Sequence, residues 1–153
     1  GGADLILSQC SSVSEAMDVA RSLVRVPILK IDEPMAEEAV RLGPRVVVAA
    51  TLPTTLGPTC RLIERSAAGA GIQVRTTRVL AEGAFDVLKA GDSARHNRMV
   101  LDALQPYRHD ADVLVMAQGS MAGLIPDLAD WGVPVLTSPR LGMERAAAML
   151  RAL

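Results

Sequence analysis

The sequence predicts an α/β fold built from parallel sheets, and three observations support this fold class. Short apolar runs of strand length alternate with longer stretches whose apolar residues recur at helical spacing. Half of the 153 residues are hydrophobic, which is enough to supply a core. A segment is also repeated within the chain at an offset near 108 residues. Strands that alternate with helices along a chain form parallel sheets whose faces the helices cover.

The first third of the chain predicts two strands and two helices. Residues 5–7 form a strand, residues 14–24 an amphipathic helix, and residues 26–29 a second strand. Pro34 then opens a helix at its first turn, where the missing N–H costs nothing, and Gly43 ends it.

The middle of the chain begins with a strongly β-prone run at residues 45–50. A helix is expected over residues 55–70, beginning near Thr54 or Pro58 and stopping at glycines. A strand is expected over residues 72–79.

The last part of the chain continues the alternation of helices and strands. The expected elements are a short helix at 83–90, a helix at 93–107, strands at 113–117 and 133–136, and a closing helix at 141–153.

The internal repeat is the most informative feature of the sequence. Residues 3–12, ADLILSQCSS, match residues 111–120, ADVLVMAQGS, and Val-Pro-x-Leu at 26–29 recurs at 133–136. In both copies a further proline, Pro34 or Pro139, follows this Val-Pro-x-Leu motif. Any two strand–helix–strand units look alike to some degree, but these shared details favour a true repeat.

The repeat predicts two pseudo-symmetric α/β halves with Rossmann-like layers, the first of them incomplete. Residues 1–43 are expected to be the C-terminal part of the first half and residues 44–136 the second half. Residues 137–153 would form a closing helix that packs back on the first half. The chain opens Gly-Gly-Ala-Asp without an initiator Met or a signal peptide, so we expect that it starts partway through a longer protein.

Composition excludes two classes of partner. With a formal net charge of -1 and three aromatic residues, the chain lacks the clustered cations and stacking faces that nucleic acid needs. The longest apolar runs have strand length, so no membrane span is expected.

The two cysteines, Cys10 and Cys60, form no CxxC motif. One disulfide between them is formally open, but two free thiols in a reducing cytoplasm are the simpler interpretation.

No cofactor or metal is predicted. The glycines form neither a GxGxxG nor a Walker pattern, so a nucleotide cofactor has no support. His96 and His109 are not at ligand spacing from either cysteine, and we expect both on the surface.

Polar segments follow three of the predicted strands, at residues 8–12, 51–55 and 118–121. Ligands of open parallel sheets bind beyond the carboxyl ends of the strands, so these segments should be neighbours. Cys10 also precedes a helix, whose N–H groups and positive dipole end would stabilise a thiolate and lower its pKa. Simple packing of a small side chain is the alternative for Cys10, and it is the favoured interpretation for Cys60 inside a helical run.

The threonines of the second segment predict an anion site. The hydroxyls of Thr51, Thr54 and Thr55 and the free N–H groups of a helix start would suit a carboxylate or phosphate. Helix capping by Thr54 or Thr55 is the alternative. In the third segment, ungapped alignment of the repeat places Gln118 opposite Cys10, whereas a one-residue gap would place Gly119 there.

The sequence resembles the aspartate/glutamate/hydantoin racemase superfamily over essentially the whole chain. The resemblance rests on QCSS at 9–12, IDEPMAEEA at 31–39, ATLPTT at 50–55, EGAF at 82–85, AQGSMA at 117–122 and VPVLTSPRLG at 133–142. Each motif is short, but their order and spacing together are specific.

This resemblance implies a cofactor-independent site between two similar domains. Family members use two facing cysteines to remove and return a proton at a carbon next to a carboxylate or carbonyl. Cys10 matches the first cysteine, and neighbouring polar groups would hold the small substrate. By the resemblance and the repeat, those groups are Ser11, Ser12, Thr51, Thr54, Thr55, Gln118, Gly119 and Ser120.

The second cysteine is the point of departure, because Gln118 stands in its place. Two-base racemisation needs a proton-exchanging group on each face of the carbon, and Gln can only donate an N–H to a developing oxyanion. We expect a racemase- or isomerase-type enzyme with Cys10 as thiolate base or nucleophile. A one-thiol decarboxylase, a maleate-type isomerase and a non-catalytic small-ligand-binding relative stay open, and a homo-oligomer is expected.

Overall fold

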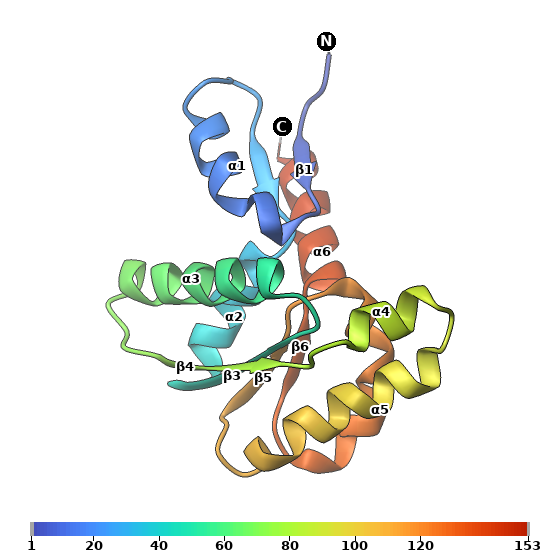
Figure 1. Ribbon diagram of the computed structural model, residues 1–153. Coiled ribbons are helices and arrows are strands. Elements are labelled where there is room, and N and C mark those ends of the chain that lie inside the picture. The colour runs from blue at the N-terminus through green and yellow to red at the C-terminus, as the bar shows by residue number, and fades with distance from the viewer. Residues whose placement is uncertain (1, 153) are drawn as a thin grey trace.

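A four-stranded sheet with helices on both faces carries a smaller two-stranded lobe at one end (Figure 1). The computed structural model describes residues 2–152. The larger sheet has the strand order β4-β3-β5-β6 and is parallel throughout. Its strands are β3 (Arg45–Ala50), β4 (Arg75–Leu80), β5 (Val113–Met116) and β6 (Val135–Thr137). β1 (Ile6–Ser8) and β2 (Ile28–Lys30) form the parallel sheet of the small lobe, so the predicted α/β fold is confirmed.

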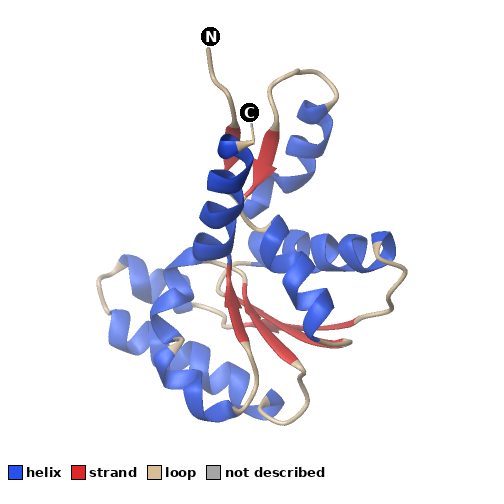
Figure 2. Cartoon of the chain, turned by 180° about the vertical axis from the view of Figure 1, so that it is seen from behind, coloured by secondary structure: helices blue, strands red, loops and turns tan. Residues whose placement is uncertain are grey.

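β3 lies at the centre of the core because both of its faces are apolar. Val46 and Val48 are packed in one hydrophobic cluster and Val47 and Ala49 in another, as alternation along a strand requires. Helices α2 (Glu33–Leu42) and α3 (Pro53–Gly69) cover the first face, and α4 (Ala84–Lys89) and α5 (Ser93–Leu104) cover the second (Figure 2).

Proline accounts for three of the differences between the predicted and observed helix ends. α3 begins at Pro53, which takes a first-turn position, and the helix continues through Pro58. α6 (Ser138–Arg151) likewise begins before residue 141, with Pro139 in its first turn. α5 ends at Leu104, where Pro106 helps to tighten the chain into a 3₁₀ turn, η2 (Gln105–Tyr107). No helix within residues 2–152 is long and apolar enough to cross a membrane.

The internal repeat is also a structural repeat. β1 pairs with β2 in the same register in which β5 pairs with β6. The N–H of Ile6 donates to the carbonyl of Pro27, and the N–H of Leu114 donates to that of Pro134, both at 2.9 Å. After β1 the chain forms η1 (Ser11–Val13) and α1 (Ser14–Arg21), whereas after β5 it forms two 3₁₀ helices, η3 (Gly119–Leu124) and η4 (Pro126–Trp131).

The two helices that follow equivalent strands cross between the lobes. α2 follows β2 but packs its apolar residues, including Met35 and Val40, against α3 and β5 of the larger sheet. α6 follows β6 but rises beside the small lobe and contacts β2 and α2 (Figures 1 and 2). The sequence-based division at residue 43 therefore places α2 with the first half, whereas its packing places it on the second.

Charged side chains connect the elements of the small lobe. The guanidinium of Arg21 donates to the carbonyl of Ile28 at 2.6 Å and to the carboxylate of Glu33 at 2.6 Å. The ammonium of Lys30 is buried, with 3% of its side chain exposed, and lies 2.6 Å from the carboxylate of Asp18. A buried ammonium needs such a partner, so these contacts tie α1 to β2 and to the start of α2.

The ionised form of Glu33 is expected to stabilise the fold. Burial raises the pKa of Glu33, but hydrogen bonds from Arg21 and the Lys30 N–H, together with both charges, outweigh it and hold that pKa below 4.5. A carboxyl with a lowered folded-state pKa stabilises the protein above its unfolded-state pKa. That stability is lost as the pH falls through the lowered value. As the pH decreases below 4.5, we expect the free energy of unfolding to decrease. This decrease should be smaller in Glu33→Gln, which has no carboxylate to protonate. Urea unfolding above and below this pH measures it, and an identical pH dependence in both proteins would contradict it.

Gly142 allows α6 to approach the end of β2. A Cβ at this position would lie 2.6 Å from the backbone oxygen of Ile31 and would also overlap the Ile31 side chain. Gly142→Ala is therefore expected to lower the free energy of unfolding by about 1–3 kcal/mol, because backbone atoms must shift. Gly69→Ala, at a helical position with nothing within 4 Å, is the matched control for urea unfolding. Equal stability of the two variants would show that α6 can move away at no cost.

Candidate active site

A pocket of about 150 Å³ lies at the carboxyl ends of strands from both lobes. Its lining comes from segments that follow β1, β2, β3, β5 and β6. The lining residues are Gln9, Cys10, Ser11, Ser12, Ile31, Thr55, Ala117, Gln118, Gly119 and Ser138. The three polar segments that the sequence predicted to be neighbours therefore meet in one pocket.

Most of the lining consists of pseudo-symmetric pairs, one member from each half. The pairs are Gln9 with Ala117, Cys10 with Gln118 and Ser11 with Gly119, each 108 residues apart, and Ile31 with Ser138, 107 residues apart. The repeat thus builds the pocket from equivalent strand ends that approach it from the two lobes.

Cys10 and Gln118 occupy equivalent backbone positions. Cys10 precedes η1 with φ -128° and ψ 108°, and Gln118 precedes η3 with φ -127° and ψ 135°. The carbonyl of Cys10 accepts from the N–H of Val13 at 3.2 Å, and that of Gln118 accepts from the N–H of Met121 at 3.0 Å. These matches select the ungapped alignment of the repeat over the one that set Gly119 opposite Cys10.

The two cysteines have different environments. Cys10 is a free, exposed thiol that lines the pocket, whereas Cys60 is fully buried on α3. Burial raises the pKa of the Cys60 thiol, so Cys60 stays protonated at neutral pH. Cys60 is a packing residue, as its helical position predicted, and Cys10 is the thiol that a molecule in the pocket can reach.

The three threonines predicted to bind an anion separate in the structure. Thr55 is largely buried and lines the pocket. Thr54 is exposed and does not line it, because successive residues of an α-helix point about 100° apart. Ser120 belongs to the third predicted segment and was predicted to bind the substrate, but it is also exposed and outside the lining. Neither Thr54 nor Thr55 is the N-cap of α3, which is Leu52.

Thr51 contacts Gln118 and does not line the pocket. Its backbone N–H donates to Oε1 of Gln118 at 2.6 Å, and its hydroxyl donates to the same oxygen at 2.9 Å. Only 4% of Thr51 is exposed. The structure therefore gives Thr51 a protein partner, where the sequence predicted a direct contact with the substrate.

Ser138 is a candidate that sequence reasoning missed. It lies at the start of α6, is 6% exposed and lines the pocket. The signal was present in the repeat, because the Val-Pro-x-Leu match pairs Ser138 with Ile31, another lining residue. Within the described residues the lining carries no charged side chain, so any anion in it is held by hydroxyl and amide groups.

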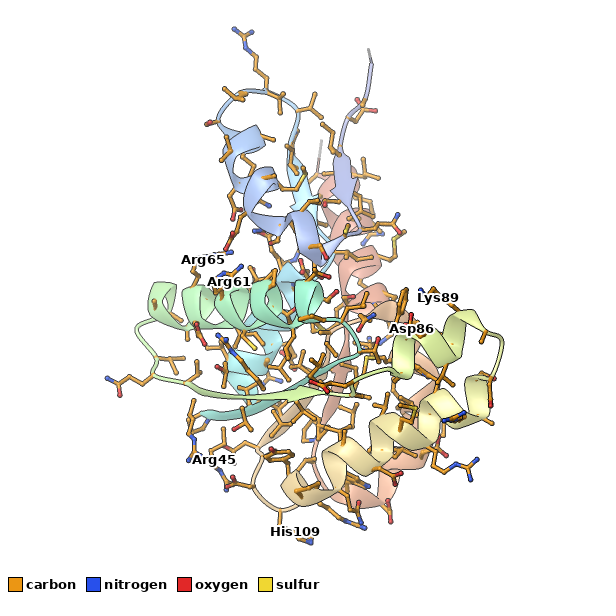
Figure 3. The ribbon with its side chains drawn as sticks, in the orientation of Figure 1. Arg45, Arg61, Arg65, Asp86, Lys89 and His109 are labelled. Carbon is orange, nitrogen blue, oxygen red and sulfur yellow. The ribbon has the colours of Figure 1, made fainter. Side chains whose placement is uncertain are left out.

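The two histidines lie outside the pocket, and one of them is buried. His96 was predicted on the surface but is 1% exposed, since it shares the inner face of α5 with Val100 and Leu104. His109 is exposed at the end of the larger sheet opposite α1 (Figure 3). In residues 2–152, no group of three or more His, Cys, Asp or Glu is placed to hold a metal ion.

Ion pairs connect the lobes beside the pocket. Arg61 and Arg65 lie on the side of α3 that faces α1 (Figure 3). Nε of Arg61 is 2.6 Å from the carboxylate of Glu15, and this hydrogen bond is the main cause that lowers the pKa of Glu15. Arg65 lies 3.5 Å from Asp18. Because these pairs are exposed, each contributes little stability, and they add to the packing of α3 against η1.

Comparison with protein families gives one clear result. The model of a family described as Asp/Glu/Hydantoin racemase matches residues 1–146 of the chain. A search of curated proteins found no match.

Solved structures with similar folds include two racemases and a decarboxylase. A glutamate racemase from Bacillus anthracis aligns with a TM-score of 0.71 and 14% identity, covering 97% of this chain and 59% of that one. An allantoin racemase from Pseudomonas fluorescens gives 0.63 and 23%, covering 99% and 64%. A glycine-to-cysteine mutant of arylmalonate decarboxylase gives 0.60 and 18%, covering 97% and 67%. The chain thus spans about three fifths of the length of the racemases, and at these identities the likeness is one of fold.

Proposed function

The chain belongs to the Asp/Glu/hydantoin racemase family, and we propose that it is a cofactor-independent racemase- or isomerase-type enzyme acting on a small carboxylate or carbonyl compound. The observation that carries the proposal is the position of Cys10 and Gln118, which line one pocket from equivalent strand ends. A base on one side and an N–H donor on the other suit proton transfer at a carbon next to a carbonyl.

In the proposed reaction, the Cys10 thiolate removes a proton from the carbon next to the carboxylate or carbonyl group. The C–H bond breaks, an S–H bond forms, and the electron pair moves onto the neighbouring oxygen. An N–H of Gln118 then stabilises the developing oxyanion, and the thiol returns a proton to the carbon. With one thiol in the pocket, return of the proton to the same carbon takes place on the same face and only exchanges the hydrogen. A net isomerisation follows when the thiol returns the proton to a different carbon of the conjugated anion.

The pocket sets the size and chemistry of a substrate. Its volume of about 150 Å³ corresponds to roughly five water molecules in the liquid. Hydroxyls of Ser11, Ser12, Thr55 and Ser138 can hold a carboxylate by hydrogen bonds, and Gly119 leaves room because it has no side chain. We therefore infer a substrate with a single small carboxylate or carbonyl group.

A one-thiol decarboxylase is the second candidate, and the replacement of a thiol by Gln118 is what favours it. In that reaction the bond to a leaving carboxylate breaks, carbon dioxide departs, and the electron pair moves onto the remaining carboxylate. The Cys10 thiol then protonates the carbon from one side. One of the solved structures with a similar fold is of a decarboxylase mutant.

Solvent exchange tests the proposal. The protein is incubated in D₂O with a panel of small monocarboxylic and malonic acids, and NMR follows the hydrogens on the carbon next to each carboxylate. We expect deuterium to enter at least one acid, or a malonic acid to lose carbon dioxide. Acids that bind but show neither exchange nor product would make the protein a binding relative and the proposal wrong.

A further inference from the structure

The side-chain amide of Gln118 has one permitted orientation. Its Oε1 accepts from the backbone N–H of Thr51 at 2.6 Å and from the Thr51 hydroxyl at 2.9 Å. A backbone N–H can only donate, so the amide atom that faces it must be the carbonyl oxygen. Turning the amide over would set its NH₂ group against the N–H of Thr51.

The NH₂ group of Gln118 is therefore the end of the amide that is available to hydrogen-bond a molecule in the pocket. Gln118 lines the pocket, and no protein acceptor is bonded to its Nε2 within residues 2–152. Two N–H donors of this kind suit an oxygen acceptor, and a negatively charged oxygen gives the stronger hydrogen bond. A cationic or donor group at the same place would meet only donors.

Thr51 is well placed to hold this orientation. It follows β3, which pairs with β4 on one edge and β5 on the other and is buried from Val46 to Ala50. Both donors of Thr51 are used on Gln118, and the residue is 4% exposed. A donor held by a central strand keeps its geometry better than one on a free loop.

We propose that Thr51 is a positioning residue that locks Gln118 as an N–H donor for an anionic oxygen beside the Cys10 thiol. The pocket would then select carboxylates over neutral amides of the same shape. This inference rests on the proposed function, because it needs Cys10 and Gln118 to face the same bound molecule.

Alkylation of Cys10 by two reagents tests the inference without a known substrate. Iodoacetate and iodoacetamide both form a C–S bond with the thiolate and release iodide, but only iodoacetate carries a carboxylate. The rates at Cys10 are measured by mass spectrometry of its peptide, and the ratio of the iodoacetate rate to the iodoacetamide rate reports on anion binding. A change that merely loosened the pocket would alter both rates together and leave the ratio unchanged.

We expect Gln118→Leu to lower this ratio about tenfold, as the loss of a hydrogen bond to a charged group would, and Gln118→Glu to lower it further. Thr51→Val removes the hydroxyl but keeps the N–H, so the ratio should fall about threefold. Thr51→Ser keeps both donors and should restore the parent value. Circular dichroism confirms that each variant is folded.

The outcomes separate the two proposals. An unchanged ratio in Thr51→Val and in Gln118→Leu overturns the role of these residues while leaving Cys10 as a reactive thiol. If neither reagent modifies Cys10 of the parent protein at neutral pH, the proposed function fails, and this inference fails with it.

Discussion

Replacing Cys10 with Ala is expected to slow proton exchange about 10²- to 10⁴-fold, the contribution that a positioned acid–base group makes. No other thiol lines the pocket within the described residues, and its remaining polar groups are hydroxyls and amides that stay protonated at neutral pH. Cys10→Ser should be about as slow as Cys10→Ala, since a hydroxyl of similar size does not ionise there. The measurement is the rate of deuterium incorporation by NMR into whichever acid the parent protein exchanges.

Cys60→Ala is the matched control for the loss of Cys10. It removes the second thiol from a fully buried site on α3, so it should lower the free energy of unfolding and leave the exchange rate near that of the parent. Full exchange activity in Cys10→Ala would remove Cys10 from the mechanism.

Gln118→Cys is expected to change the stereochemistry of the reaction. Gln118 has the same backbone position in its half as Cys10 has in the first half, so the substitution sets a thiol on the second side of the pocket. Two thiols would allow a proton to be removed from one face and returned to the other. A single enantiomer that the parent protein leaves unchanged should therefore be racemised, as followed by chiral chromatography.

Gln118→Ser separates the effect of the thiol from that of losing the amide. It should weaken the substrate interaction in the same way without racemising the product. If Gln118→Cys is alkylated at the new thiol and still exchanges hydrogen on one face only, positions 10 and 118 do not lie on opposite sides of the substrate.

The parts of the fold that the sequence predicted best are those fixed by local pattern. The bounds of β3 were predicted correctly because a continuous apolar run is typical of a strand that is buried on both faces of a parallel sheet. The start of α6 was missed because the predicted helix began at residue 141, after Pro139, although proline is favoured in a first helical turn. The crossing of α2 to the larger sheet depends on which apolar surfaces meet in three dimensions, which a linear pattern does not encode.

For the site, the repeat was a better guide than residue type. It predicted that Cys10 and Gln118 are counterparts, and the same logic would have found Ser138. Hydroxyl residues near a helix start cannot be told apart in sequence. Thr54 and Thr55 differ because they point in different directions from α3, and Thr51 differs because it is hydrogen-bonded to Gln118. His96 was misplaced because its burial follows from the packing of α5, whose inner face also carries Val100.

The central claim is that a single thiol, Cys10, moves the proton from one side of the pocket. An acid with two hydrogens on the carbon next to its carboxylate tests it directly, because those hydrogens point to opposite faces. The parent protein in D₂O should exchange one of the two and leave the other, as resolved by NMR of a chiral derivative. Exchange of both hydrogens at comparable rates would contradict the account, since it would require a second proton-exchanging group where Gln118 stands.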